Sequence, residues 1–457
     1  MHVAYCGTGY QGLQIQKNEP EVATIEGELG RALVRAGRVL ESNVGAHHKM
    51  GWSRSSRTDK GVHSLATLIG LKMEVQEEEF LDDREGLSIA AGINEHLPEQ
   101  VRILSVQRTN QKFDARNATH TRTYQYYLPL DALSPGNPGE AMEDRLQLLR
   151  SCLALFKGVH AFHNFTKRRL YRDDVRESMR RKHPKRVHTG LSTSETLAAQ
   201  QTSLDPGPTE ASPSTCLEPS EEASIPESVI AIAHQTDGNE AAELAESDSK
   251  PESHEAEHSA EEDGPGPLQK WERPMTFSWG EEVDASDLVS AAHHRNILSI
   301  ETSDPMSLVP GGVPCIKVTL RGQSFMLHQI RHMVGAAVAV ARGILPLEFV
   351  KTSLLKPARS YMPLAPAPVL ILTETEVLPW KEDVQRVMGH IIGRQLQLGP
   401  GGAQAQDTFS SQVLHPAIDE LLQSEEWGRW DKSLQRMWYE ESDMATYILA
   451  ASAFKSH

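Results

Sequence analysis

The order of the predicted elements indicates an α+β fold. Short alternating or apolar stretches that predict strands are interspersed with amphipathic stretches that predict helices, and their order is too irregular for a repeating parallel βαβ array. A chain of 457 residues also has enough apolar material for two or three domains. We therefore expect mixed layers of sheet and helix in more than one unit.

The first 130 residues supply a first unit. Four stretches in it predict strands: residues 2–5, 65–71, 101–106 and 120–128. In the last of these, Arg122, Tyr124 and Tyr126 fall on one face. Thr24 is suited to be the N-cap of the amphipathic helix that follows it, and a further helix is expected near residues 86–96.

A second unit begins with a helix around residues 146–156. It is predicted to continue with neighbouring strands at 297–300 and 315–320, an apolar helix that opens over 323–336, and a final strand that follows a proline-rich turn within 363–372. Beyond Trp380 we expect helices, including 418–422 and 427–438, with the glycine-rich residues 399–402 as a separator.

The acidic charge is concentrated in one segment. Residues 191–270 hold 18 Asp or Glu and two Lys, which leaves 44 of the 46 Lys and Arg and 44 of the 62 Asp and Glu to the rest of the chain. The net charge of -16 therefore belongs to this segment, whose Ser, Glu, Pro and Ala residues follow no period and predict disorder. The electrically neutral remainder does not exclude a polyanionic partner.

A basic tract precedes the acidic segment. Between residues 167 and 186, ten Lys or Arg stand against three acids, directly after the aromatic residues Phe162 and Phe165. Such a tract is either a solvated face or a site that attracts a phosphate backbone, and the sequence leaves both interpretations open.

The cysteines and the hydropathy favour an intracellular protein. Cys6, Cys152, Cys216 and Cys315 form no CxxC pair, which argues against a disulfide framework or a structural zinc site. The longest apolar run, residues 333–341, is much shorter than the roughly 20 residues of a membrane span. No signal peptide is visible. We expect a nuclear protein, or one in a mitochondrion or another organelle if a leader precedes this sequence.

Gly7, Gly9 and Gly12 match the GxGxxG pattern of dinucleotide-binding proteins. A true fingerprint opens directly into a helix, whereas the residues after Gly12 alternate and then stop at Pro20. The sequence therefore favours a glycine-rich strand connection over a nucleotide site.

The stretch Ser53–Ser64 combines one carboxylate, Asp59, with several bases and hydroxyls, and it leads into the predicted strand at 65–71. Asp and Gly in Thr-Asp-Lys-Gly are also ordinary turn residues, and Gly61 allows the turn. A lone acid among cations beside a rigid strand is, however, typical of an active site.

The segment His328–His332 resembles the zinc motif HExxH, but Gln329 replaces the glutamate that would act as general base. Two histidines without a third ligand are more often packing or RNA-facing residues than metal ligands. Arg331 lies within a predicted apolar helix, so its charge is expected to face a partner.

Together these features resemble the eukaryotic branch of the TruA family of tRNA pseudouridine synthases. The resemblance covers roughly residues 1–186 and 271–377, and five blocks carry it in the family's order: Tyr5–Gln14, Ser56–Ser64, Arg122–Tyr126, His160–Thr166 and Gly322–Gly335. It implies a pseudouridine synthase fold, in which two α/β subdomains with mostly antiparallel sheets flank a central RNA-binding cleft.

On this basis we divide the chain into four parts: an N-terminal subdomain at 1–130, a C-terminal subdomain at 131–190 and 271–380, a disordered acidic insert at 191–270, and a helical extension at 381–457. The resemblance also implies isomerisation of uridine in tRNA, and in other structured RNAs, with no metal or nucleotide cofactor. The base would leave C1′ through N1 and rejoin it through C5.

The family's site residues map onto five positions of this chain. A carboxylate can act as a covalent nucleophile, and Asp59 would attack either C1′ or C6 of a flipped uridine. The resemblance implies that Arg331 forms an ion pair with Asp59, that Tyr124 stacks on the base and takes part in proton transfer, that Arg57 supports the flipped site, and that Leu370 lines an apolar wall.

A second interpretation is a catalytically silent RNA-binding or chaperone protein on the same scaffold. The intact set of Asp59, Tyr124 and Arg331 favours the enzyme, because such a protein has no need to keep all three.

Overall fold

The computed structural model describes residues 1–16, 21–43, 48–135, 141–166, 275–280, 289–379 and 395–454. All of them belong to one unit, formed by residues 1–184 and 269–457, while a second unit, residues 185–268, lies outside the described residues. The predictions of a basic tract at 167–186 and of a disordered acidic insert at 191–270 also concern residues outside this description.

Strands and helices alternate irregularly along the chain, as an α+β fold requires. The strands are β1 His2–Tyr5, β2 Ser53–Arg54, β3 His63–Gly70, β4 Val101–Ser105, β5 Thr119–Pro129, β6 Gly158–Ala161, β7 Phe277–Trp279, β8 His294–Thr302, β9 Cys315–Gly322, β10 Ala358–Ser360 and β11 Leu370–Val377. The helices are α1 Ile25–Arg35, α2 Leu87–Asn94, α3 Ala115–Ala118, α4 Met142–Ala154, α7 Gln329–Ala341, α8 Leu347–Thr352, α10 Pro400–Phe409, α11 His415–Leu422, α12 Glu425–Gln435 and α13 Glu441–Phe454. Short 3₁₀ turns occur at Glu41–Asn43, Glu77–Phe80, Leu130–Ala132 and Ala291–His293, and a π-helical turn at Ser410–Leu414 joins α10 to α11.

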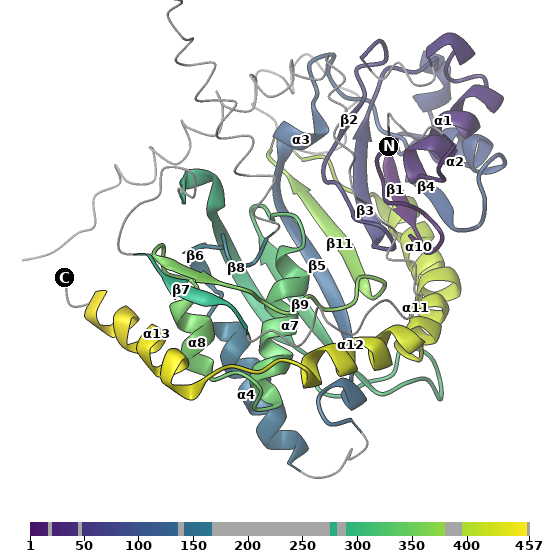
Figure 1. The fold of residues 1–457 in the computed structure, drawn as a ribbon. Coiled ribbons are helices and arrows are strands. Elements are labelled where there is room, and N and C mark those ends of the chain that lie inside the picture. The colour runs from purple at the N-terminus through teal and green to yellow at the C-terminus, as the bar shows by residue number, and fades with distance from the viewer. Residues whose placement is uncertain are drawn as a thin grey trace, which may run out of the picture. The chain divides into compact units, whose positions relative to one another are not determined.

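One large mixed sheet organises the described residues. Its strand order is β4-β1-β3-β11-β5-β9-β8-β6, with β2 paired to β3, and a separate small sheet joins β10 to β7. Among the described strands, β11 and β3 pair in parallel and the other pairs of this sheet are antiparallel. Figure 1 shows β3, β11 and β5 side by side in the middle of the sheet. The sheet thus runs continuously through both predicted subdomains, whose boundary at residue 130 remains a prediction.

Most predicted elements are present near their expected positions. Thr24 caps α1, since its hydroxyl accepts the N–H of Gly27 at 3.2 Å. The strands expected at 297–300 and 315–320 are the neighbours β8 and β9. The final strand, β11, begins at Leu370 directly after the proline-rich turn, as predicted, because residues 363–369 form a loop in which prolines cannot donate to a sheet ladder.

Helix α7 is the central helix of the main core. Twelve of its thirteen residues are buried, and Arg331 is the exception. It begins at Gln329, so the prediction that it opens at Gln323 is wrong. The preceding residue, His328, has a left-handed backbone with φ 64°, which ends the turn at 326–329 before the helix can start.

Two apolar clusters lie on the sheet. The larger one joins α4, α7, α8 and the C-terminal helices to β5, β9 and β11. The smaller one joins α1 and α2 to β1 and β4, and Figure 1 shows these helices beside that end of the sheet. The Asp59 loop, residues 55–62, leads into β3, which contributes to both clusters through Leu65 and Ile69.

The glycine-rich residues 399–402 do not separate helices, contrary to prediction, because they form the start of α10. Pro400 is well suited to the first helical position, where no N–H is needed. The N–H groups of Gly401 and Gly402 donate to the Glu85 carboxylate at 3.2 and 2.8 Å, which places a negative charge at the positive end of this helix. This contact fastens the C-terminal helices to the first half of the chain.

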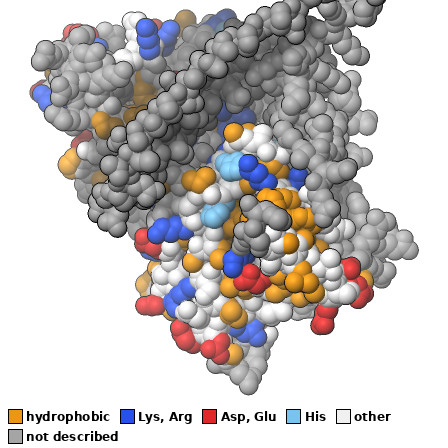
Figure 2. Space-filling model, turned by 90° about the vertical axis from the view of Figure 1, so that its left-hand side faces the viewer, with side chains coloured by type: hydrophobic (Ala, Val, Ile, Leu, Met, Phe, Trp, Pro, Cys, Tyr) orange, Lys and Arg blue, Asp and Glu red, His pale blue; other side chains and the backbone are white. Residues whose placement is uncertain are grey.

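Figure 2 looks at the side on which α13 lies in Figure 1 and shows hydrophobic side chains grouped on part of that face. On α13 itself, Leu449 and Phe454 are 68% and 48% exposed. None of the helices that the structure describes is long and apolar enough to cross a membrane.

Candidate active site

The Asp59 loop is anchored at both ends. Its serine end is fixed by Ser55, whose N–H donates to Leu68 O at 2.9 Å and whose hydroxyl accepts the Leu68 N–H at 3.0 Å. At the other end, the Val62 N–H donates to Asp59 O at 3.1 Å, and Gly61 takes φ 75° to complete this turn. The Asp59 carboxylate therefore projects from a tight turn directly before the buried strand β3.

The glycine pattern after β1 allows close approach to that turn. A Cβ on Gly7 would lie 2.2 Å from Val62 O, and a Cβ on Gly12 would lie 2.8 Å from Thr58 O. Only residues without a side chain can pass so close to the backbone of the loop. Residues 13–16 and 21–24, the part of this stretch that the structure describes, contain no helix before α1 begins at Ile25, in keeping with a glycine-rich connection rather than a dinucleotide site.

Arg122 clamps the Asp59 loop from β5. Its guanidinium donates to Ser55 O at 2.7 Å, to the Ser56 hydroxyl at 3.0 Å and to Gln323 O at 2.6 Å. Burial lowers the pKa of Arg122, yet its donors are satisfied by the two segments that flank the site. The clamp gives Ser55 and Ser56 the roles that the sequence alone did not assign.

The Asp59 carboxylate is partly buried, with 28% of its side chain exposed. The carboxylate lies 3.6 Å from His328 Nε2, the nearest cation-forming group among its described contacts. Burial raises the pKa of Asp59, while the positive charge of Arg331 lowers it. The charge of Arg331 thus opposes the effect of burial on this carboxylate, and the His328 imidazole lies beside it.

Arg331 faces the site from the first turn of α7. Its Nε donates to Ala365 O at 2.7 Å, and its own backbone carbonyl accepts the Ala365 N–H at 3.2 Å. The charge of Arg331 and that of Asp59 act on each other, but no direct ion pair between them is among the salt bridges of the described residues. In this arrangement Arg331 is held by the 363–369 loop, and His328 makes the closest approach to Asp59.

Tyr124 forms an aromatic pair beside the carboxylate. Its ring meets that of Phe325 edge-on, with centroids 5.2 Å apart and an angle of 79°. Burial raises the pKa of Tyr124, with opposing effects from Arg122 and a hydrogen bond to Ser56, and the negative charge of Asp59 raises it further. The phenol is therefore neutral at physiological pH.

The 363–369 loop closes the site from the side of β11. Tyr126 donates to Pro366 O at 2.9 Å, and His63 lies 2.7 Å from Pro368 O. A Cβ on Gly61 would meet the Pro368 ring at 3.7 Å, so this loop touches the Asp59 turn. Leu370 follows it as the first residue of β11 and is 6% exposed.

The five predicted residues are distributed unevenly. Asp59, Arg331 and Tyr124 lie close enough to interact electrostatically. The charge of Arg331 lowers the pKa of Asp59, and the charge of Asp59 raises the pKa of Tyr124. Arg57 is exposed, two residues before Asp59. Leu370 lies opposite Tyr126 in the sheet, two residues beyond the loop contact at Pro368.

Sequence reasoning missed three groups that shape the site. The HExxH-like pattern points to His328 only as a metal ligand or as a packing or RNA-facing residue, whereas its place three residues before Arg331 is the signal for a position at the site. Phe325 lies in the stretch 323–336, for which the sequence predicts a helix and no contact with Tyr124. Glu426 comes from α12 in the C-terminal extension, and its charge acts on Arg331, a relationship that no local pattern reveals.

The described residues hold no group of three or more His, Cys, Asp or Glu suited to a metal ion. The two histidines of the segment His328–His332 have different surroundings. His332 is buried, its Nδ1 lies 3.0 Å from Met362 O, and burial lowers its pKa to about 4. It packs under the site, whereas His328 faces Asp59.

Comparison with known proteins agrees with these features. Residues 281–376 match the family model described as tRNA pseudouridine synthase. A tRNA pseudouridine(27/28) synthase of Saccharomyces cerevisiae is 29% identical over 372 residues, which is 81% of this chain and 82% of that protein. A tRNA pseudouridine synthase 1 of Candida glabrata is 28% identical over 380 residues, 81% of this chain and 59% of that protein.

A third relative, the human pseudouridylate synthase 1 homolog, is 36% identical over 170 residues, 36% of this chain and 38% of that protein. The chain spans between 22% and 59% of the length of four fungal tRNA pseudouridine synthase 1 proteins that it matches. These comparisons confirm the resemblance that the five sequence blocks indicated.

Proposed function

From the premise that this chain is a relative of the TruA-type tRNA pseudouridine synthases, we propose that it isomerises uridine to pseudouridine in tRNA. One arrangement carries the proposal. Asp59, on a tight and clamped turn, has His328 within 3.6 Å, the charge of Arg331 acting on it, and the aromatic ring of Tyr124 nearby. A carboxylate, a nearby cation and a stacking surface are what a flipped uridine requires.

Asp59 is the nucleophile in this proposal. If it attacks C1′, an ester bond forms to the ribose while the C1′–N1 bond breaks, and N1 leaves with the electron pair. The base then turns, C5 bonds to C1′ and displaces the carboxylate, the C5 proton is lost, and N1 takes up a proton. If it attacks C6 instead, the adduct forms on the base before the glycosidic bond breaks. Either route requires ionised Asp59, which Arg331 favours.

Tyr124 supplies the stacking surface, because its ring is already held edge-on by Phe325. Its neutral phenol is also placed to exchange a proton with the base after cleavage. Leu370, buried at the start of β11, forms the apolar wall behind the base. Arg57, exposed at the entrance of the turn, fills the space that the flipped nucleotide leaves in the RNA.

The substrate binds, in this proposal, in a cleft between two α/β subdomains, with Asp59 contributed by one and Arg331 by the other. The basic tract at 167–186 contacts phosphates, and other structured RNAs that present the same shape are also substrates. We place this activity in the nucleus, without a metal or nucleotide cofactor.

The decisive experiment is tritium release from C5-labelled uridine in a pool of tRNA transcripts, with wild-type protein and Asp59→Ala. Release by the wild type and its absence with the variant are expected. No release by the wild type on any transcript contradicts the enzyme and leaves only RNA binding. Equal release by both contradicts the role of Asp59 alone. Wild-type and variant binding of tRNA, measured in parallel, separates loss of chemistry from loss of affinity.

A further inference from the structure

The small sheet β7–β10 has one face on the core and an opposite, outer face. On the inner face, Phe277 packs against Phe349 and Tyr447, with ring centroids 5.6 and 5.2 Å apart. Side chains alternate between the two faces along a strand, so the outer face carries Ser278 and its pairing partner Arg359. Packing on the core therefore accounts for the inner face, and the outer face is placed to contact a ligand.

Tyr361 directly follows β10 and continues this outer face. It comes two residues after Arg359 and is 52% exposed. The two other exposed aromatic residues among those that the structure describes, Trp438 and Phe454, are 43% and 48% exposed. An exposed aromatic ring beside a cation is what proteins use to stack an unpaired base of a nucleic acid.

The charged residues of the small sheet are basic. Residues 275–280 and 356–362 contain two bases, Lys356 and Arg359, and no acidic residue. Lys356 is exposed. Arg359 Nη1 donates to Lys356 O at 2.5 Å and to Ala358 O at 2.9 Å, which fixes the position of its guanidinium. Positive charge at fixed positions suits the phosphates of a nucleic-acid backbone.

The outer face is continuous with the candidate active site. Met362, the residue after Tyr361, has its carbonyl oxygen 3.0 Å from Nδ1 of His332, which packs under the site. Ala365, whose carbonyl and N–H both bond Arg331, follows Tyr361 by four residues. The Cα atoms of Tyr361 and Ala365 are therefore at most about 14 Å apart. An RNA bound at the site is thus within reach of Tyr361.

A second connection links β10 to the other side of the site. The Ser360 N–H donates to Asn164 Oδ1 at 3.0 Å. Two residues after Asn164, the Thr166 hydroxyl donates to Leu327 O at 2.9 Å, directly before His328 in the chain. The basic tract at 167–186 follows Thr166 in the sequence. The last described residue before that tract is thus bonded beside the site and is close to β10 through Asn164.

We propose that the outer face of β7–β10 binds the RNA strand next to the modified uridine, with Tyr361 stacked on an unpaired base and Lys356 and Arg359 at the flanking phosphates. This inference rests on the proposed modification of tRNA. Stacking and phosphate contacts do not read a particular base, so this face recognises an unpaired nucleotide rather than a sequence. It would thereby favour uridines beside a loop or at the end of a stem, where a neighbouring base is free to turn out.

Charge and position favour RNA over a second copy of this chain as the occupant. Two copies that met through this face would bring their Lys356 and Arg359 side chains together, and like charges oppose such a contact. A polyanion is attracted by the same charges. The face also continues into the site at which the same RNA is proposed to present its uridine.

The test measures the Kd of the full chain for tRNA transcripts over a range of salt concentrations. Tyr361→Ala should raise the Kd at least about fivefold through the loss of one stacked base, whereas Tyr361→Phe keeps the ring and should bind as the wild type does. Tyr361→Leu, which is apolar but has no ring, should bind as weakly as Tyr361→Ala and replaces it if the alanine variant does not fold. Lys356→Gln should reduce the slope of log Kd against log salt by about one.

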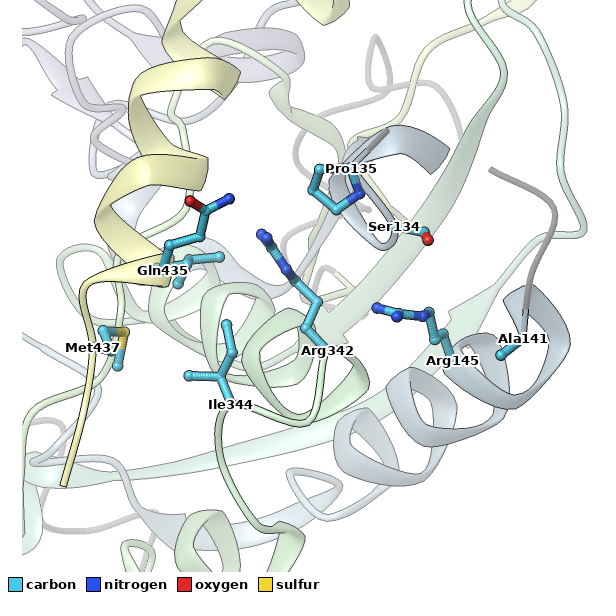
Figure 3. Close-up of a pocket in the computed structure, with 9 residues that line it drawn as sticks. Ser134, Pro135, Ala141, Arg145, Arg342, Ile344, Gln435 and Met437 are labelled. Carbon is cyan, nitrogen blue, oxygen red and sulfur yellow. The ribbon is translucent and has the colours of Figure 1, made fainter. Parts of the chain in front are cut away.

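Arg145 provides the control for the loss of a positive charge. It lines a pocket of about 670 Å³, and Figure 3 shows it on α4 in the same pocket as Arg342. Arg342 is the C-cap of α7, about 15 Å along the helix from His332 at 1.5 Å per residue. Arg145 Nη1 already donates to Leu133 O at 2.7 Å. Arg145→Gln should therefore leave the Kd for tRNA and its salt dependence unchanged.

Tritium release by the same variants separates this inference from the proposed function. With an active wild type, Tyr361→Ala should raise KM and keep kcat within about twofold, since the ring contacts RNA away from the reacting uridine. Weaker tRNA binding by Tyr361→Ala, without tritium release by any of the proteins, would contradict the modification and support the RNA-binding face.

Three outcomes overturn the proposal. The first is a wild-type Kd for Tyr361→Ala and Tyr361→Leu. The second is equal weakening by Tyr361→Phe, which would show that the ring does not stack. The third is self-association of the wild type that Tyr361→Ala abolishes while tRNA binding is unchanged, which would assign the face to a second copy of the chain.

Discussion

His63 and Pro368, 305 residues apart, are joined by a 2.7 Å hydrogen bond between the imidazole Nε2 and the backbone carbonyl. The other ring nitrogen, Nδ1, accepts the N–H of Gly7 at 3.0 Å. An acceptor at Nδ1 and a carbonyl at Nε2 are satisfied together only by the neutral Nε2–H tautomer. The buried His63 ring, which follows the Asp59 turn, thus connects the glycine-rich segment to the 363–369 loop. The same loop carries the Ala365 carbonyl that accepts from Arg331.

This bridge predicts acid sensitivity. Burial lowers the pKa of His63 to about 4, with the bond to Pro368 opposing it. The unfolded chain, with a histidine pKa near 6.5, takes up the proton first, so folding stability falls as the pH decreases from about 6.5 to about 4. One such proton contributes a slope of up to about 1.4 kcal/mol per pH unit.

His63→Gln removes the titrating ring, and the difference in unfolding free energy between wild type and variant, measured by urea denaturation, should shrink as the pH falls through that window. Other buried histidines are common to both proteins and cancel in the difference. A difference that is constant from pH 7 to pH 4 contradicts the assigned neutral ring.

Arg122 is expected to stabilise the fold more than its place in the motif suggests. Arg122→Lys keeps the charge but loses the planar fork that reaches Ser55, Ser56 and Gln323 together. We expect a loss of about 2–4 kcal/mol in unfolding free energy, since buried acceptors lose charged donors. Arg116→Lys, an exposed neighbour on α3, is the matched control and should change stability by less than about 0.5 kcal/mol. Equal effects of the two substitutions would contradict the clamp.

The sequence predicted what local pattern controls. Alternation located the strands, Thr24 was recognised as a cap from its residue type, and a single arginine in the apolar stretch of α7 was expected to face a partner. Arg331 is indeed the one residue of that helix that is not buried. These features depend on neighbours within a few residues, which is the range that periodicity and capping report.

What the sequence could not supply is the insertion of β11 between β3 and β5, because strand pairing over more than 200 residues leaves no local trace. The same limit hid the contact of His328 with Asp59, the clamp of Arg122 and the nearness of Glu426 to Arg331. The start of α7 was misplaced because a non-glycine residue in the left-handed region, His328, is rare and carries no composition signal.

His328 allows activity and stability to be separated. Asn tolerates the left-handed backbone at φ 64° better than most residues, so His328→Asn should unfold at or above the wild-type temperature. Its shorter side chain removes the imidazole that lies 3.6 Å from Asp59, and we expect tritium release to fall about tenfold, equivalent to about 1.4 kcal/mol. Wild-type release by a stably folded variant would show that His328 does not support the carboxylate.

Arg331 should act on the titration of Asp59 directly. Burial raises the pKa of Asp59 and Arg331 opposes this rise, so removal of the charge in Arg331→Gln raises the pKa further. The acidic limb of the pH profile of tritium release, which reports ionisation of the nucleophile, should move to higher pH. Arg331→Lys keeps the charge but not the bond to Ala365, and its limb should stay near the wild-type position while the rate falls. Identical limbs in all three proteins would contradict this account.

Glu426 provides the opposite change from a different part of the chain. Burial raises the pKa of Glu426, with the charges of Arg331 and Arg429 and a bond from the Ala367 N–H opposing it. When ionised, the Glu426 carboxylate offsets part of the positive charge of Arg331 that stabilises the Asp59 carboxylate. Glu426→Gln removes the competitor, so the acidic limb of tritium release should move to lower pH, the reverse of Arg331→Gln. Because Glu426 is partly exposed, solvent screening should make this shift smaller than the one caused by Arg331→Gln.

Its neighbour Glu425 is exposed at the start of the same helix, so Glu425→Gln is the matched control and should leave the limb in place. A double variant of Glu426→Gln with Arg331→Gln tests the route of the effect. If Glu426 acts through Arg331, Glu426→Gln should shift the acidic limb much less in a protein that already carries Arg331→Gln than in the wild type. The cycle then shows coupling between the two positions. Additive shifts would mean that α12 influences Asp59 by another path, through the Ala367 backbone and the 363–369 loop.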